Sequence, residues 1–371
     1  MNILCISNGH GEDLIACKIA SANTTTSTSL HITGIPLVGT GHAYKQHRIP
    51  LIIQNPPFPS GGFIRSIKDL LSDLKNGLLT HVFHQIKLIR KQSQKNSITI
   101  AVGDIFCLIM ASFSKNTVYF IPTAKSDTFM PHSFIERFLI KRLAKKSFPR
   151  DLQTTHSFLK HNLSAIYFGN PMMDNLRTTK KIITKNTHCP ILGILPGSRQ
   201  EAYKNCAFAM KVCEYLVTKQ KDVTILCAFP DTLNLETLIS MTKWRASKHT
   251  LQTTLTSPTN TCSIIFTNEF LPTINQANCL IGLAGTANEQ ALFLNKPVVC
   301  FKGFGPQSTL KRFQEQRKLM GPLLNICHNR NPNDICEMLI PLLNQKKPPI
   351  KQNQPHASAQ ILNDIIQTHL R

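Results

Sequence analysis

Several glycine-containing segments lie between an apolar run and a helix-like stretch, a place where proteins often bind phosphate. The first follows the apolar run of residues 3–6 and consists of Ser7, Asn8, Gly9, His10, Gly11, Glu12 and Asp13. Glycine at such a turn lets backbone N–H groups approach a phosphate or a sugar, and the N-terminus of the following helix adds partial positive charge. We expect a ligand-binding loop here, although Glu12 and Asp13 could serve only as anions at the helix N-terminus.

This first loop lacks the spacing of a dinucleotide-binding site. Such a site follows the pattern Gly-x-Gly-x-x-Gly and has an acidic residue about 20 positions further on. Residues 21–43 contain no Asp or Glu. The sequence therefore argues against a Rossmann dehydrogenase.

A lone carboxylate, Asp104, follows the apolar run of residues 98–102. In open α/β sheets ligands bind at the carboxyl ends of the strands, so Asp104 is well placed to act as a general base. The alternative is that Asp104 caps the helix predicted over residues 105–113. Both roles could hold together.

The second glycine-containing segment opens the later half of the chain, where Gly197, Ser198 and Arg199 follow the apolar run of residues 191–195. Gly197 and Ser198 suit a tight turn, and Arg199 offers a planar fork of donors that matches phosphate oxygens. These residues predict a phosphate site. The alternative is a surface arginine paired with Glu201.

A further run of small residues, Gly285, Thr286 and Ala287, leads from a strand-like segment directly into a helix-like one. N–H groups at such a helix start can face a diphosphate. Glu289 lies one turn further on, where a carboxylate can bind two ribose hydroxyls or only complement the helix dipole. We expect Gly285, Thr286, Glu289 and the adjacent Gln290 to bind a ligand that carries a diphosphate and a ribose.

Apolar runs alternate with helix-period stretches along the chain, which favours parallel sheets covered by helices on both faces. The alternation restarts after the basic stretch of residues 177–188, so we expect two α/β domains. Residues 357–370 predict a terminal helix that must pack on another part of the protein. The predicted strands cover residues 3–7, 30–35, 51–53, 98–102, 118–121, 165–168, 191–195, 223–229, 263–266, 279–283 and 297–301.

Composition describes a globular and strongly basic protein. The chain has 371 residues, 42% of them hydrophobic, and a formal net charge of +22, which predicts an anionic partner. Its twelve cysteines show neither a Cys-x-x-Cys pair nor zinc-site spacing, so we expect no metal and buried free thiols in a reducing cytoplasm. An apolar run begins at Ile3 and leaves no signal peptide, and the best candidate span, residues 98–113, is short and interrupted by Asp104.

Two basic segments could touch a membrane. Residues 64–89 place apolar side chains on one helical face and lysines elsewhere, as in a helix on anionic lipid or in a helix packed on its own sheet. The second segment has the same ambiguity and contains Lys141, Arg142, Lys145, Lys146 and Arg150. Neither accompanies a nucleic-acid-binding module, so no nucleic acid is expected.

Taken in order, these motifs resemble those of lipid-A-disaccharide synthase and its relatives among the GT-B glycosyltransferases. Residues 196–199 match the donor-side arginine motif of that family. The segment from Gly285 to Glu289, followed by residues 295–299, is similar to its nucleotide-binding unit, and residues 169–174 resemble the start of its linker. Residues 7–13 and 302–307 depart from the synthase pattern, which indicates a synthase-related branch, so the fold and the donor class carry over more safely than the acceptor.

The resemblance implies a GT-B fold, with two Rossmann-like doubly wound parallel-sheet domains that face a cleft. Residues 1–172 would form the acceptor-side domain, residues 173–188 a linker, and residues 189–350 the UDP-sugar-binding domain. Residues 351–371 would form a C-terminal helix that packs back on the first domain.

The resemblance also implies a metal-independent glycosyltransferase without a cofactor, peripheral on the inner face of the membrane. It would move a sugar, of the N-acetylhexosamine type, from a UDP-sugar to a lipid-linked or membrane-surface acceptor with inversion at the anomeric carbon. Asp104 or His10 would be the base. The alternatives are a UDP-sugar epimerase or hydrolase of the same fold, and a non-catalytic basic protein that binds anionic membranes.

Overall fold

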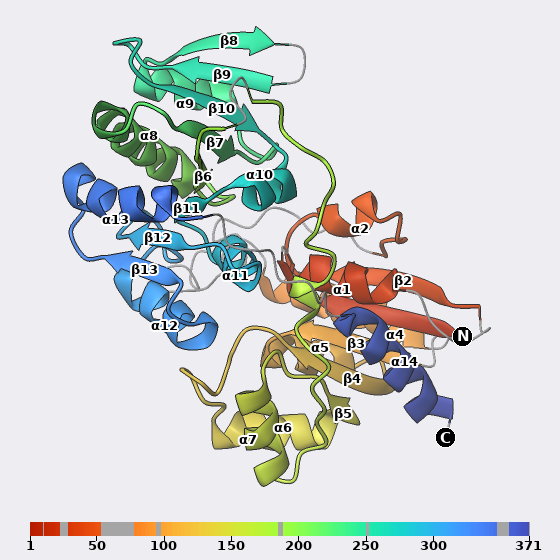
Figure 1. The fold of residues 1–371 in the computed structure, drawn as a ribbon. Coiled ribbons are helices and arrows are strands. Elements are labelled where there is room, and N and C mark those ends of the chain that lie inside the picture. The colour runs from red at the N-terminus through yellow and green to blue at the C-terminus, as the bar shows by residue number, and fades with distance from the viewer. Residues whose placement is uncertain are drawn as a thin grey trace. The chain divides into compact units, whose positions relative to one another are not determined.

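The computed structural model divides into two compact α/β units (Figure 1). It describes residues 1–9, 11–22, 29–52, 78–93, 98–184, 188–249, 252–346 and 356–370. The first unit combines Met1–Asp174 with Pro355–Arg371, and the second is Asn175–Gln354. The C-terminal segment is therefore grouped with the first unit.

The first unit contains a parallel five-stranded sheet with the strand order β2-β1-β3-β4-β5. Its strands are β1 (Asn2–Ser7), β2 (His31–Pro36), β3 (Ile98–Gly103), β4 (Thr117–Pro122) and β5 (Lys146–Ser147). Its helices are α1 (Gly11–Ala20), α2 (His42–Gln46), α4 (Leu78–Ser93), α5 (Ile105–Ser112), α6 (Phe134–Leu143), α7 (Leu152–Lys160) and α14 (Ala357–Leu370), with a short 3₁₀ turn, η1 (Pro171–Met173).

Alternating side chains of the central strands build two separate cores. In β1, Ile3 and Cys5 pack with side chains of α1 and α14, whereas Leu4 and Ile6 pack with side chains of α5, α6 and α7. Successive side chains of a strand point to opposite faces, so helices must cover both faces of this sheet. The doubly wound architecture expected from the sequence is confirmed for this unit.

Helix α14 is held by packing and by a cap that lies far away in the sequence. Its apolar face, which includes Ile361, Ile365 and Ile366, is almost completely buried against the α1 side of the sheet. Each such side chain contributes roughly 1.5–3 kcal/mol when fully buried. Asp174, itself buried, accepts hydrogen bonds from the backbone N–H groups of Ala357 (3.2 Å) and Ser358 (2.7 Å).

Replacing Asp174 by alanine is expected to lower the free energy of unfolding by about 2 kcal/mol, because two helix N–H groups lose a buried charged acceptor. Urea unfolding of the full chain measures the loss, and hydrogen exchange should show it first in α14. The matched control is Asp364→Ala, which removes from the same helix a partly buried ion pair with Lys146 (2.8 Å). That change should cost less than about 1 kcal/mol, and an equal effect of the two variants would contradict the capping role.

The second unit contains an eight-stranded sheet with the order β13-β12-β11-β6-β7-β10-β9-β8. Six strands are parallel, while β9 pairs antiparallel with β10 and β8 pairs antiparallel with β9. The strands are β6 (Ile191–Leu195), β7 (Thr224–Ala228), β8 (Arg245–His249), β9 (Gln252–Thr256), β10 (Ser263–Thr267), β11 (Cys279–Gly282), β12 (Val298–Phe301) and β13 (Leu324–Cys327).

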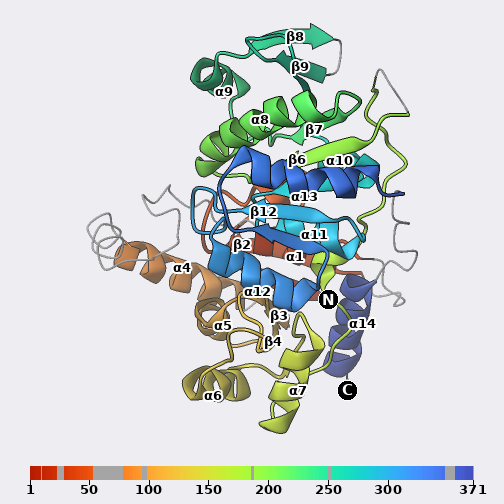
Figure 2. The same ribbon diagram turned by 60° about the vertical axis from the view of Figure 1, so that its left-hand side comes forward.

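Helices cover both faces of this second sheet. Figure 2 shows α8 and α13 side by side on one face, with α10 on the other. The helices are α8 (Glu201–Lys219), α9 (Leu235–Thr242), α10 (Phe270–Gln276), α11 (Thr286–Phe293), α12 (Leu310–Met320) and α13 (Pro332–Asn344). Lys296, fully buried, donates to the backbone oxygens of Asn275 (3.0 Å) and Ala277 (2.8 Å) and so satisfies carbonyls at the C-terminal end of α10.

Several sequence-based strand predictions are wrong. The strand predicted over residues 165–168 is a single bridge between Ala165 and Ser147, because β5, its only neighbour, is two residues long. The strand predicted over residues 51–53 is likewise one bridge, from Leu51 to Gly34, and residue 53 lies outside the described residues. The β8–β9 hairpin was not expected, since its strands are rich in Thr, Ser and basic residues and show no apolar alternation.

The helix predicted over residues 64–89 can be judged only in its second half, because residues 64–77 lie outside the described residues. From residue 78 onward it is α4, and its apolar side chains Val82, Ile86 and Ile89 pack into the core beside α5. This part of the helix covers its own sheet. None of the helices in the described ranges combines the length and the apolar character needed to cross a bilayer.

Candidate functional site

The predicted acceptor-side loop lies at the carboxyl end of β1, next to the ends of β2 and β3. The N–H of Asn8 donates to the carbonyl of Val102 on β3 (3.2 Å), and the N–H of Glu12 donates to the carbonyl of Gly9 (3.2 Å). Gly11 begins α1, and a side chain at this position would touch Met172. His10, the alternative base, lies outside the described residues.

Asp104 follows β3 directly and begins α5. Its Oδ1 accepts the N–H of Cys107 (3.1 Å), so the helix-cap alternative is confirmed. The turn before it requires glycine, since Gly103 has φ of 152° and a Cβ there would lie 2.8 Å from Cγ of Asn8. This close approach packs Asn8 against the base of the Asp104 loop.

Glu12 lies close to Asp104 at the same edge of the sheet. Thr123, which follows β4, donates its hydroxyl to Glu12 Oε1 (3.4 Å), and Arg150 donates to the carbonyl of Thr123 (3.1 Å). Burial raises the pKa of Glu12 above its ordinary value, the Asp104 carboxylate adds to the rise, and Thr123 and Arg150 partly oppose it. The carboxyl ends of β1 and β3 thus place two acids near each other, and Arg150, which follows β5, reaches this edge through Thr123.

Asp13 has a different environment from Glu12. It is buried and accepts a hydrogen bond from the Ser7 hydroxyl (2.6 Å), and that hydroxyl is also 2.7 Å from the Tyr44 hydroxyl. Burial, helped by the nearby Glu12 and opposed by the Ser7 hydrogen bond, raises the pKa of Asp13 to about 7. The structure therefore places the Asp13 side chain within the packing beneath the loop.

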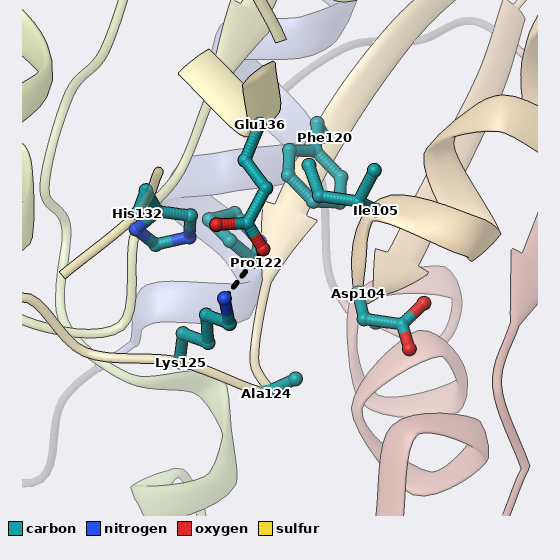
Figure 3. A pocket seen from close by; sticks show the side chains of 9 residues that line it. Asp104, Ile105, Phe120, Pro122, Ala124, Lys125, His132 and Glu136 are labelled. Atoms are coloured by element: carbon teal, nitrogen blue, oxygen red, sulfur yellow. Dashed lines mark hydrogen bonds and ion pairs between the residues drawn. The ribbon is translucent and has the colours of Figure 1, made fainter. Parts of the chain in front are cut away.

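A small pocket opens beside Asp104 at the end of β4 (Figure 3). Lys125 and Glu136 form an ion pair of 2.5 Å within its lining. His132 also lines the pocket, and its Nδ1 is 2.6 Å from Asp127 Oδ1. The carboxylate of Asp104 points away from the Lys125–Glu136 pair. Sequence analysis did not single out Lys125, His132 or Glu136.

The predicted donor residues of the second unit gather at the carboxyl ends of β6 and β11, which are adjacent strands. A Cβ on Gly197 would lie 3.6 Å from the carbonyl oxygen of Leu283, so the loop after β6 touches the loop after β11. Ser198 and Thr286 are exposed at this edge, and Arg199 is half-buried. The structure thus brings the Gly197–Arg199 and Gly285–Thr286 segments together.

A third loop, which follows β12, joins these two through buried hydrogen bonds. The side-chain amide of Asn205 donates to the carbonyls of Pro196 (3.3 Å) and Phe304 (3.2 Å), and its oxygen accepts the Phe304 N–H (2.7 Å). The Ser308 hydroxyl donates to the carbonyl of Leu283 (2.8 Å). Two polar side chains therefore fix the relative positions of all three loops.

Helix α11 begins in the middle of this arrangement. Gly285, its N-cap residue, has no side chain to cap the helix, and its carbonyl accepts the Gln316 amide (2.8 Å). A Cβ at Gly285 would lie 3.0 Å from Gln307 Oε1, which places the loop after β12 against the helix start. Glu289 and Gln290 are buried in the first turns of α11.

The third loop also contains Phe304, whose aromatic ring contacts two cationic side chains. The guanidinium of Arg330 lies 4.3 Å from the ring centroid of Phe304 and 4.3 Å from that of Phe208, and the Lys204 amine lies 5.6 Å from the Phe304 ring. Such contacts hold Phe304 in place and keep positive charge at this edge. Phe304 belongs to the segment of residues 302–307 whose sequence departs from the synthase pattern.

The loop-fixing residues left only weak signals in the sequence. Asn205 stands among the apolar positions Ala202, Cys206 and Ala209 of α8, and a lone amide on an apolar helix face was the one available indication. Ser308 had none, because its partner Leu283 is 25 residues away. The twelve cysteines are free and eleven of them are buried, as predicted. Within the described ranges, no three His, Cys, Asp or Glu side chains gather as metal ligands.

No protein-family model and no curated protein sequence matches the chain. Solved structures do match it over nearly its whole length. A putative UDP-N-acetylglucosamine 2-epimerase from Listeria monocytogenes has a TM-score of 0.63 at 11% identity, covering 100% of this chain and 96% of its own. The chain adopts the GT-B fold.

Two further solved structures share this fold with the chain. UDP-GlcNAc 2-epimerase from Neisseria meningitidis, bound to UDP-GlcNAc, has a TM-score of 0.58 at 13% identity, with 100% of both chains covered. MurG from Acinetobacter baumannii has a TM-score of 0.53 at 12% identity, with 99% of both chains covered. Among the solved structures with this fold, some are named as epimerases and others as glycosyltransferases.

Proposed function

We propose that this protein is a UDP-sugar-dependent glycosyltransferase related to lipid-A-disaccharide synthase, which moves an N-acetylhexosamine-type sugar to a lipid-linked acceptor. One observation carries the donor half of the proposal: the loops after β6, β11 and β12 meet at one sheet edge and are fixed by Asn205 and Ser308. There Arg199 and the N-terminus of α11 offer donors suited to a diphosphate. UDP or UDP-GlcNAc is bound in two of the neighbouring structures.

In the proposed reaction the acceptor hydroxyl loses its proton to a base and its oxygen attacks the anomeric carbon. The bond from that carbon to the diphosphate oxygen breaks, and UDP leaves with the electron pair, so the configuration is inverted. Arg199 and the N–H groups around Thr286 would stabilise the charge that develops on the diphosphate, which is usually the largest single contribution to such catalysis. Glu289 and Gln290, with Gly197, Ser198 and Gly285, complete the proposed donor set.

The acceptor would bind at the carboxyl edge of the first unit. Asn8, Gly9, Gly11, Glu12 and Asp13 belong to the proposed acceptor loop. Asp104 and His10 are the bases proposed from the sequence, and Glu12 is a further titratable group at that edge with a raised pKa.

A second candidate is a UDP-sugar epimerase or hydrolase, which the epimerases among the neighbours favour. A panel of UDP-sugars offered with and without membrane lipid extract separates the candidates. UDP release that requires the extract supports transfer, whereas epimerised sugar or UDP released without extract supports the second candidate. Failure of UDP to bind the chain would contradict both.

The membrane part of the proposal is supported by α6 more than by the basic cluster expected from the sequence. Phe134, Ile135 and Phe138 are 78%, 68% and 58% exposed, and Lys141 and Arg142 are exposed in the last turn. Side chains at three- and four-residue spacing share a helix face, so this face is apolar at its beginning and basic at its end. Such a face suits insertion between anionic lipids.

Other residues of the basic cluster are engaged within the first unit. Lys146 pairs with Asp364 (2.8 Å), Lys145 donates to the carbonyl of Thr368 (3.0 Å), and Arg150 donates to the carbonyl of Thr123 (3.1 Å). The same helix α6 contributes Glu136 to the pocket beside Asp104. A lipid-linked acceptor at this face would therefore be close to the proposed acceptor site.

Vesicle co-sedimentation tests this surface. The double variant Phe134→Ser/Phe138→Ser is expected to bind vesicles of phosphatidylglycerol and phosphatidylcholine at least about tenfold more weakly, because each buried Phe contributes roughly 1.5–3 kcal/mol. Met241→Ser, which changes a 49% exposed side chain on α9 of the other unit, is the matched control and should bind as the natural chain does. Unchanged binding of the double variant would contradict the membrane role of α6.

A further inference from the structure

The pocket of the first unit contains a buried histidine–carboxylate pair that the proposed reaction has not yet used. His132 is 4% exposed, and its Nδ1 lies 2.6 Å from Asp127 Oδ1. The same oxygen accepts the backbone N–H of His132 (3.0 Å). Both residues follow β4, whose carboxyl end lies at the sheet edge that also holds Asp104.

Neighbouring elements fix the position of this pair. The His132 ring makes a T-shaped contact with Phe158 on α7, with centroids 4.9 Å apart and planes at 76°. The backbone N–H of Asp127 donates to the Thr154 hydroxyl (2.9 Å). Burial alone would raise the pKa of Asp127, but hydrogen bonds from Ser157 and His132 outweigh burial and hold that pKa below its ordinary value. Asp127 is therefore an ionised acceptor, which fixes the tautomer of its partner.

The consequence for the imidazole is that a neutral ring carries its proton on Nδ1 and a lone pair on Nε2. In the described part of the chain, no hydrogen bond engages Nε2, and the ring lines the pocket together with Lys125 and Glu136 (Figure 3). The side chains of Lys125 and Glu136 are paired with each other, and Glu136 also accepts the Ser133 N–H (2.7 Å).

Two further carboxylates near the pocket have other roles. Asp104 caps α5 and directs its carboxylate away from the Lys125–Glu136 pair, on the side where it interacts with Glu12. Asp151, which caps α7, accepts hydrogen bonds from Thr154. Among the groups of the described chain that line the pocket, His132 has the proton acceptor best placed for a ligand.

We propose that His132, held by Asp127, is the base that removes the proton from the acceptor hydroxyl. This inference rests on the proposed transfer reaction. The O–H bond of the acceptor breaks and its proton moves to Nε2, while the oxygen forms the bond to the anomeric carbon. The bond from that carbon to the diphosphate breaks, and UDP departs with the electron pair. Asp127 acts as a positioning residue that holds the ring and stabilises the imidazolium.

The decisive variant is His132→Asn, because the Asn amide can still donate to Asp127 but has no proton acceptor in place of Nε2. Extract-dependent UDP release should fall by about 10²–10⁴-fold, and the acid limb of the pH–rate profile should disappear. His156→Asn, on the exposed side of α7, is the matched control and should keep the natural rate. If His132→Asn keeps its rate, or if the acid limb disappears only in Asp104→Asn, the inference is overturned.

Asp127→Asn should lower kcat and leave KM nearly unchanged, since it alters orientation and not contact with the acceptor. A second measurement needs no sugar: nitrogen NMR of the histidine side chains should find His132 protonated on Nδ1, and this preference should be lost in Asp127→Asn. A proton on Nε2 would overturn the inference. If the natural chain has the expected tautomer but transfers no sugar, the proposed function fails and only the oriented pair stands. If it transfers sugar and His132→Asn does too, the function stands and the inference fails.

Discussion

Replacing Arg199 by alanine is expected to lower extract-dependent UDP release by about 10²–10³-fold, mainly through kcat, because the guanidinium acts on charge that develops as UDP leaves. Arg199 lies in the loop after β6, which Asn205 ties to the loop after β12 through the carbonyls of Pro196 and Phe304. Because buried hydrogen bonds hold the backbone of this loop, the Arg199 guanidinium needs little reorganisation during the reaction. Steady-state rates with saturating UDP-sugar measure the effect.

The matched control for this variant is Arg245→Ala, which removes an arginine of the same unit at the far edge strand β8. That guanidinium donates to Pro258 O (3.1 Å) and Asn260 Oδ1 (2.9 Å) and lies five strands away from β11 in the sheet order. Its loss should leave both UDP binding and the rate unchanged. Equal UDP release by Arg199→Ala and the natural chain would contradict the role of this guanidinium in the reaction. No UDP release by either would instead favour the non-catalytic alternative, in which membrane binding through the basic surface is the whole function.

The sequence predicted the elements whose side chains are buried on both faces. Strands β1, β3, β4, β6 and β11 are apolar runs because helices cover them on each side, and the predicted ranges differ from the observed ones by one or two residues at most. The same logic placed Asp104 and Gly285 at sheet edges, since the carboxyl ends of parallel strands meet there. The local sequence pattern was sufficient to place these residues at the carboxyl ends of their strands.

Side-chain pairs that depend on tertiary packing could not be predicted from the sequence. His132 and Asp127 are five residues apart, but what makes their pair distinctive is the packing on Phe158 and the pocket shared with residues that follow β3. Asn205 and Ser308 are 103 residues apart and become a unit only when three loops meet. Each of these residues, taken alone, has the pattern of an ordinary polar side chain.

Replacing Asp13 by asparagine is expected to make the stability of the first unit depend less on pH. The pKa of Asp13 is about 7 in the folded chain, against an ordinary value of 3.8, chiefly because the side chain is buried. Between those two values the folded state binds a proton that the unfolded state has lost, so the free energy of unfolding falls as pH rises. Between pH 3.8 and about 7 the free energy of unfolding falls by roughly 4 kcal/mol. Above pH 7 Asp13 is ionised in both states, so no further loss from this group follows.

Asparagine keeps an oxygen that can accept the Ser7 hydroxyl but cannot ionise, so Asp13→Asn should resemble the natural chain near pH 4 and be more stable at pH 8. Urea unfolding at both pH values, followed by hydrogen exchange in β1 and α1, measures the difference. Asp364→Asn makes the same charge change in a partly buried ion pair of the same unit and should not reproduce this pattern. If both variants show the same dependence on pH, Asp13 is ionised without penalty at neutral pH. The Ser7–Tyr44 network would then be stabilising a charge, and Asp13 would regain its place among the acids available to the acceptor.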